Sequence, residues 1–194
     1  MSLFNFFKHK AKTDELATAL TYMVARFIVE NFNKKTEEEK FEIFYFLAFQ
    51  IDKMFFDLNP QKRNELFDAF GHELFSSLIK EDASSEDKRN ALDFFMESYD
   101  ERATIYANCS SLIGEKGGFP GKGSAIFALG YFLKRASGGI GIDLENVKDL
   151  LKGKGDVNEK NINAFLDFPE ILELTMQIST IVIEIKKFLN KFKI

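Results

Sequence analysis

The chain has 194 residues, 45% of them hydrophobic and 29% charged, and its formal net charge is −4. This length and composition are typical of one folded globular domain and leave little room for two. The longest charge-free stretches, 103–114 and 123–133, are shorter than the roughly 18 residues that cross a bilayer, so we expect no integral membrane segment. The apolar start is too short for a secretory signal, and the one cysteine, Cys109, cannot form an internal disulfide. We therefore expect a cytoplasmic protein.

Negative charge gathers in the middle of the chain. Residues 36–101 carry seventeen Asp and Glu against seven Lys and Arg, a net charge of −10, whereas the segments on either side are net positive. A nucleic-acid surface needs a basic stripe, so this distribution predicts no nucleic-acid binding. The acidic charge suits the solvated faces of surface helices, and an acidic surface also steers binding toward basic partners.

The chain begins with a tail, 1–13, that is first apolar and then basic and that we expect to be flexible. Asp14 is a suitable N-cap for an amphipathic helix over 14–33. Apolar residues recur at helical spacing through that segment, at Leu16, Leu20, Met23, Phe27 and Ile28. The tail would precede a single helical domain over 14–194.

The second predicted helix, 37–57, starts at a capping box formed by Thr36 and Glu39. Its core sequence, FEIFYFLAFQIDKMFF, is apolar on nearly every side, and such a helix is normally buried all round. Two interpretations follow. Either the other helices enclose it, or its outer aromatic residues form a surface for a protein partner or for a second copy of the chain. In the second interpretation the partner-binding residues are Tyr45, Phe46, Phe49 and Phe56.

Two further long helices are predicted after this one. Pro60 suits the first turn of a helix over 60–80. Ser84 or Ser85 caps the next helix, whose pattern fails near Gly114.

Arg102 is the most unusual polar residue of the chain, because it lies on the inward stripe of that fourth helix between Tyr99 and Tyr106. A guanidinium that faces a core must be paired, since an unpaired buried charge is very costly. We expect an ion pair with a carboxylate of the acidic middle region. The alternatives are an anion-binding or ligand-binding site framed by the two phenols, and simple exposure at the surface.

Glycine interrupts the helical pattern in the segment 114–157. Short helices are predicted at 124–136, 143–152 and 159–167, and a last long helix starts at Pro169. That last helix carries a heptad seam at Ile171, Leu174, Ile178, Ile181, Ile185, Phe188 and Phe192. The fold class we predict is all-α: a multi-helix bundle of four to five long helices with a Gly-rich irregular insertion.

No motif with a defined chemistry is complete. The insertion lacks the spacing and the preceding strand of a P-loop, and 156–167 lacks the glycine and the final glutamate of a calcium loop. His9 and His72 do not form metal-binding pairs, and the sequence pattern gives Cys109 no adjacent base. We therefore predict no catalytic residue, no metal and no cofactor. Lys122, just before a helix N-terminus, is a candidate for holding an anion.

Three classes of function remain. The first is a non-enzymatic protein-interaction or regulatory module, such as an inhibitor or immunity protein, with a protein partner or as a homodimer. The second is a small-ligand sensor whose pocket lies beside the Gly-rich insertion. The third is weak membrane-surface association through Leu3, Phe4 and Phe7 with the lysines that follow. The acidic middle, the surplus of aromatic residues and the lack of a catalytic constellation favour the first class.

Overall fold

A computed structural model describes residues 3–78, 84–109, 124–138 and 168–192, and these residues form six helices and no strand. The helices are α1 (Leu3–Asn31), α2 (Glu37–Leu58), α3 (Arg63–Leu78), α4 (Ser85–Ala107), α5 (Ala125–Ser137) and α8 (Phe168–Phe192). The all-α bundle predicted from the sequence is therefore confirmed. In the described ranges, none of these helices combines the length and the apolar character needed to cross a membrane. The predicted short helices at 143–152 and 159–167 lie outside the described residues.

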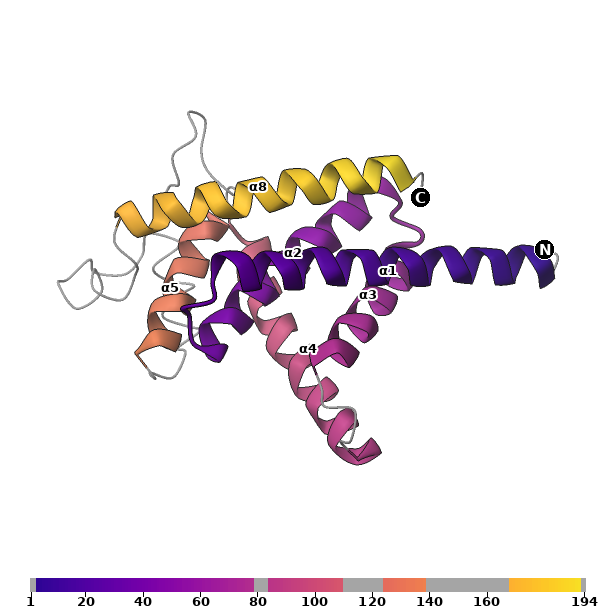
Figure 1. Ribbon diagram of the computed structural model, residues 1–194, viewed down its shortest axis with the longest axis horizontal. Coiled ribbons are helices and arrows are strands. Elements are labelled where there is room, and N and C mark those ends of the chain that lie inside the picture. The colour runs from indigo at the N-terminus through magenta and orange to yellow at the C-terminus, as the bar shows by residue number, and fades with distance from the viewer. Residues whose placement is uncertain (1–2, 79–83, 110–123, 139–167, 193–194) are drawn as a thin grey trace.

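Helix α2 is the centre of the bundle and packs against each of the other five helices (Figure 1). Its middle is buried without interruption over eleven residues, from Glu42 to Asp52. A run of that length covers about three turns, so every side of the helix is enclosed. The ends are different, because Phe41 and Phe56 are 40% and 54% exposed.

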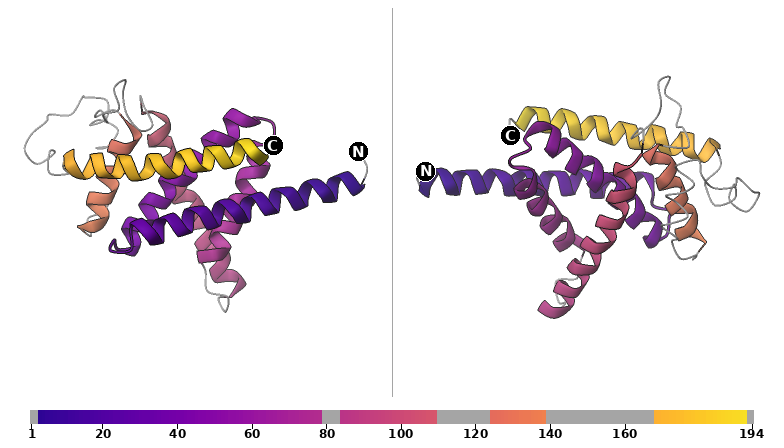
Figure 2. Two further views of the ribbon diagram at one scale, coloured as in Figure 1. Left: turned by 45° about the horizontal axis from the view of Figure 1, so that its top comes forward. Right: turned by 180° about the vertical axis from the view of Figure 1, so that it is seen from behind.

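Helices α1 and α8 run in opposite directions along the long axis of the molecule and pack against each other (Figures 1 and 2). The first turns of α1 extend past the ends of the other helices in every view. On α8, the first five positions of the predicted heptad seam are buried: Ile171, Leu174, Ile178, Ile181 and Ile185. The seam therefore serves as the inner face of a bundle helix.

The end of α3 and the beginning of α4 form a corner that projects away from α8 (Figures 1 and 2). Helix α4 packs against α2 and α5 through its second half. From Ser84 to Phe94 every residue is exposed or only half-buried, and the first buried residue is Phe95. The first half of α4 therefore stands out from the bundle.

Helix boundaries follow the predicted caps in some places and depart from them in others. The capping box of Thr36 and Glu39 is present, and Ser84 caps α4 by accepting a hydrogen bond from the backbone of Asp87. Helix α1, however, begins at Leu3 and not at Asp14, because neither glycine nor proline interrupts the segment 3–31. The predicted start of α3 is also corrected, from Pro60 to Arg63, because residues 60–62 form turns.

Helix α4 ends earlier than predicted, at Ala107. Asn108 is its C-cap, and the Asn108 side chain also donates to the carbonyl oxygen of Thr104 at 2.7 Å. Polar side chains that compete for backbone groups favour helix ends, which explains the stop before Gly114.

Candidate functional site

The aromatic residues of α2 divide between the core and the surface. Tyr45, Phe46 and Phe49 are buried, with Phe46 fully inaccessible, whereas Phe56 is 54% exposed. Phe46 and Phe49 pack on the ring of Tyr106 from α4, at centroid distances of 5.1 and 5.4 Å. The proposed partner surface is therefore wrong for Tyr45, Phe46 and Phe49, because the surrounding helices already cover these rings. Only Phe56 keeps the exposure that such a surface needs.

Arg102 and Glu42 form an ion pair in the interior. The guanidinium donates from Nε to Oε2 of Glu42 at 2.7 Å and from Nη2 to Oε1 at 2.6 Å, and both residues are less than 10% exposed. Its Nη1 donates to the carbonyl oxygen of Ser98 at 3.0 Å. This bidentate geometry confirms the ion pair expected for Arg102 and identifies its carboxylate as that of Glu42.

The groups around Arg102 stabilise its positive charge although the side chain is buried. Its guanidinium carbon lies 4.8 Å from the ring centre of Tyr45 and 5.6 Å from that of Phe132, so aromatic faces cover the cation. Burial alone lowers the pKa of Arg102, but the hydrogen bonds and the charge of Glu42 outweigh it, and the pKa is raised. Glu101 adds a second carboxylate, with its Oε2 3.8 Å from Nη1, so Glu42 and Glu101 leave no free guanidinium for an external anion.

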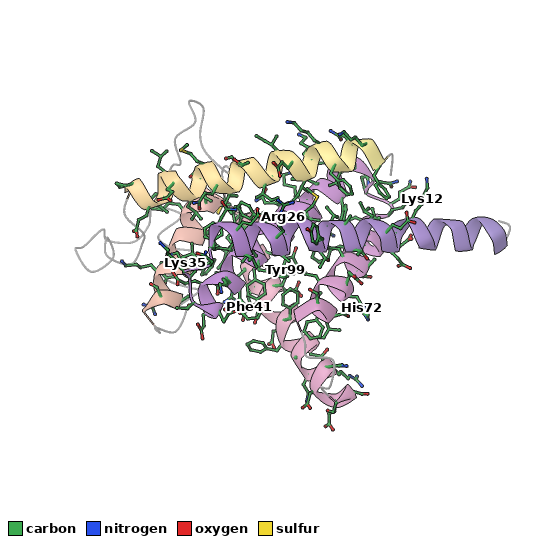
Figure 3. The ribbon with its side chains drawn as sticks, viewed as in Figure 1. Lys12, Arg26, Lys35, Phe41, His72 and Tyr99 are labelled. Atoms are coloured by element: carbon green, nitrogen blue, oxygen red, sulfur yellow. The ribbon has the colours of Figure 1, made fainter. Side chains whose placement is uncertain are left out.

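A second ion pair links α2 to α3. Arg63 donates from Nε to Oδ1 of Asp52 at 2.8 Å, and its Nη2 also contacts Oδ2 of that carboxylate. Tyr99, which projects from α4 into the interior (Figure 3), donates its hydroxyl to Asp52 at 3.4 Å. Burial and the nearby charge of Asp52 raise the pKa of Tyr99. The two acidic groups in the middle of α2, Glu42 and Asp52, are therefore each balanced by an arginine from another helix.

Tyr106 completes the set of predicted ligand residues on α4, and it lies in the core. It is 1% exposed, and its hydroxyl finds no hydrogen-bond partner among the described residues. Burial raises the pKa of this phenol well above its usual value. Burial also raises the pKa of the Cys109 thiol, to about 11, which suits a packed thiol better than a nucleophile. The structure thus places Arg102, Tyr99 and Tyr106 together as internal groups and not around an open site.

Other predicted site features fall partly or wholly outside the described residues. Lys122 lies there, and so do the side chains of Leu3, Phe4 and Phe7 and most of the Gly-rich insertion. A cavity of about 480 Å³ lies next to the insertion, between the α1–α2 connection, α5 and the start of α8. Amides and charged groups make up most of its lining, including Asn31, Lys34, Lys35, Glu173 and Gln177. Small-molecule pockets are usually lined mainly by apolar groups, so this cavity resembles a wet cleft.

The surface of α4 holds a feature that the sequence interpretation missed. Phe94 is 69% exposed, the largest exposed fraction among the large hydrophobic residues of the described chain. Six exposed carboxylates share α4 with it: Glu86, Asp87, Asp93, Glu97, Asp100 and Glu101. At 100° per residue they fall within an arc of about 140° that also contains Phe94. We call Phe94 and these six residues the α4 acidic face.

The α4 acidic face lies on the side of the helix away from the core. Phe95, Tyr99 and Tyr106 form the opposite, buried side. The two cations in the first half of α4, Lys88 and Arg89, fall outside the acidic arc. An aromatic ring thus stands among carboxylates on a helix that projects from the bundle.

Comparison with models of known protein families, with curated proteins and with solved structures found no match to this chain. In the described residues, no group of three or more His, Cys, Asp or Glu side chains is arranged to hold a metal ion. His72, labelled in Figure 3, is exposed on α3.

Proposed function

We propose that the chain is a non-enzymatic protein-interaction module that binds a basic protein segment through the α4 acidic face. The observation that carries this proposal is the 69% exposure of Phe94 on the same side of α4 as six exposed carboxylates. Aromatic residues are enriched at protein interfaces, and Phe94 combines an exposed ring with a surface whose charges are nearly all of one sign.

The proposal assigns different tasks to the two kinds of side chain. The carboxylates supply long-range attraction, which raises the rate of encounter with a basic partner and weakens as salt is added. Phe94 supplies the anchor, because a ring that leaves water on binding contributes more than the exposed charges around it. The partner would therefore present Lys or Arg side chains around an apolar pocket.

The position of the face also supports the proposal. The first half of α4 projects from the bundle, so a partner can approach it without moving any of the other described helices (Figure 1). The buried ion pair of Arg102 with Glu42 lies on the inner side of α4, so binding at Phe94 would leave that pair in place.

Site-specific photocrosslinking in the native host tests this function. A photoreactive phenylalanine analogue replaces Phe94 in one variant and Tyr22, on α1, in a matched control, because Tyr22 is similarly exposed at 64%. We expect position 94 alone to capture a basic protein, and we expect Asp93→Lys with Glu97→Lys to abolish the capture. Equal capture from positions 22 and 94, or capture that survives the charge reversal, would contradict the proposal.

The small-ligand alternative rests on the cavity next to the Gly-rich insertion. Its volume of about 480 Å³ is sufficient for a small molecule, but polar and charged residues make up most of its lining, unlike the mainly apolar walls of a typical small-molecule site. Native mass spectrometry of the purified chain distinguishes the two functions, because a resident ligand would add a fixed mass and a protein interface would not.

A further inference from the structure

A second cavity, of about 260 Å³, lies between α2 and α8 near the end of each helix. Apolar side chains form much of its wall, namely Met54, Leu58, Val182 and Leu189. Polar groups enter it at Gln50, Lys53, Asp57, Lys186 and Asn190. Unlike the cavity next to the insertion, it therefore combines apolar walls with a few polar groups, which is the usual composition of a small-molecule site.

Gln50 is the most informative residue of this lining. It is 2% exposed, and its amide nitrogen finds no hydrogen-bond partner among the described residues. Buried polar groups are nearly always hydrogen-bonded, and leaving one unpaired costs stability. The amide nitrogen is itself covered, but Gln50 lines the cavity, so a rotation of its side chain would bring this unpaired donor to an acceptor on a ligand.

The charges around the cavity indicate the sign of that ligand. Two lysines and one aspartate line the cavity. Nζ of Lys53 lies 3.7 Å from Oδ2 of Asp57, so these two charges form an ion pair. Lys186 has no ion pair within the part of the chain that the structure describes. The lining therefore carries one positive charge in excess, which a single negative charge on the ligand would balance.

We infer that the cavity between α2 and α8 binds a small carboxylic acid with a short apolar body. Its carboxylate accepts a hydrogen bond from the amide nitrogen of Gln50 and lies in the field of Lys186. Its apolar body contacts Met54, Val182 and Leu189. This site is separate from the α4 acidic face, so it does not depend on the proposed protein-interaction function.

The volume of the cavity limits the size of the ligand. Pockets for drug-sized molecules hold about 300–1,000 Å³, and this one is slightly smaller. A six- to eight-carbon carboxylate is a suitable probe of that size. For about eight to ten non-hydrogen atoms, we expect a dissociation constant of about 0.1–1 mM.

Methyl NMR of the whole chain, labelled at its five methionines, tests the site with hexanoate as the probe. Met54 lines the cavity, whereas Met96 lies on α4 and serves as an internal reference. We expect the Met54 signal alone to shift, and to saturate, as hexanoate is added. Hexylammonium and hexanol are matched probes with the opposite charge and with no charge, and we expect neither to reach saturation in the same range.

Two variants test whether the shift of the Met54 signal depends on the inferred contacts with Lys186 and Gln50. Lys186→Met should weaken hexanoate binding at least tenfold, whereas Lys187→Met, one residue along and outside the cavity lining, should leave it unchanged. Gln50→Leu removes the donor and should weaken binding while the chain stays folded. The inference is overturned if the Met54 signal does not shift at about 20 mM hexanoate, which is 20-fold above the upper end of the expected dissociation constant. It is also overturned if hexanol or hexylammonium binds equally well, or if the two lysine variants weaken binding equally.

Discussion

The guanidinium of Arg102 on α4 and the carboxylate of Glu42 on α2 meet through two hydrogen bonds, of 2.7 and 2.6 Å, in the interior of the bundle. These residues are separated by 60 positions in the sequence, so the pair fixes how α4 lies against the central helix. Tyr45 and Phe132 cover the cation and shield it from most of the solvent. The pair therefore specifies the packing of α4.

Removing one partner should cost far more than removing both. We expect Arg102→Ala to lower the free energy of unfolding by about 3–5 kcal/mol, because it leaves the Glu42 carboxylate buried and unpaired. Arg102→Met combined with Glu42→Gln should recover part of that loss. Urea denaturation measures both, with the exposed Arg89→Ala as the control. An unchanged midpoint for Arg102→Ala would contradict the burial of this pair.

The rings of α2 should respond to substitution according to their exposure. Phe46→Ser with Phe49→Ser should unfold the chain, because losing a buried phenylalanine costs about 3–5 kcal/mol at each site. Phe56→Ser, at an exposed ring of the same helix, should change the stability by about 0.5 kcal/mol or less. Circular dichroism measures helix content, and light scattering would show whether any folded double variant has lost an oligomer. A folded double variant with a changed oligomeric state would restore the surface interpretation.

Gln50 offers a test in the opposite direction, toward higher stability. Gln50→Leu has a similar volume and removes a buried amide nitrogen that has no partner. We expect it to stabilise the chain by about 1 kcal/mol and to raise the Tm by about 2–4 °C. Thermal denaturation without added ligand is the measurement. A fall in Tm would mean that the amide makes a stabilising contact in the free protein.

The buried phenols predict a loss of stability in alkali. Burial raises the pKa of Tyr99 and Tyr106 in the folded state, so the unfolded chain releases these protons first as the pH rises above about 10. The contribution of the two protonated phenols to the free energy of unfolding is thus complete below pH 10 and is lost as the pH rises above it. Burial likewise raises the pKa of Cys109 from 9.0 to about 11, so its contribution is lost between these two values.

Tyr106→Phe isolates one of these groups. Because the Tyr106 hydroxyl has no partner, the variant should be at least as stable as the wild type at pH 7. Above pH 10 the stability of the variant should fall less steeply with pH than that of the wild type. The two slopes should differ by about 1.4 kcal/mol per pH unit, the contribution of one proton. Urea titrations at several pH values measure the two slopes. Identical slopes would show that the pKa of the Tyr106 phenol is the same in the folded and the unfolded chain.

Local signals in the sequence predicted much of the fold. The capping box at Thr36 and the stripe that carries Arg102 depend on residues three or four positions apart, and both are present as expected. The partner of Arg102 was not predictable, because several carboxylates of the acidic middle were equally available until the helices were placed. The periodicity of α2 also could not separate enclosure from a partner surface, since both need an apolar helix on all sides.

The exposed position of Phe94 could have been predicted from helical periodicity. The sequence predicts an inward stripe on α4 that carries Tyr99, Arg102 and Tyr106. Phe94 lies outside that stripe and among acidic residues, so helical geometry alone would have placed it on the outer face. Its exposure nevertheless depends on how the helices are placed, and none of the other five described helices covers Phe94, which only the assembled structure reveals.

The affinity of the crosslinked partner for three forms of the chain tests the role of the α4 acidic face most directly. The forms are the wild type, Phe94→Ser and the exposed control Tyr22→Ser, each checked for folding by circular dichroism. The proposal predicts that Phe94→Ser weakens binding about 30-fold, which corresponds to about 2 kcal/mol, while Tyr22→Ser changes it less than about twofold. Equal affinities for the wild type and Phe94→Ser would contradict it.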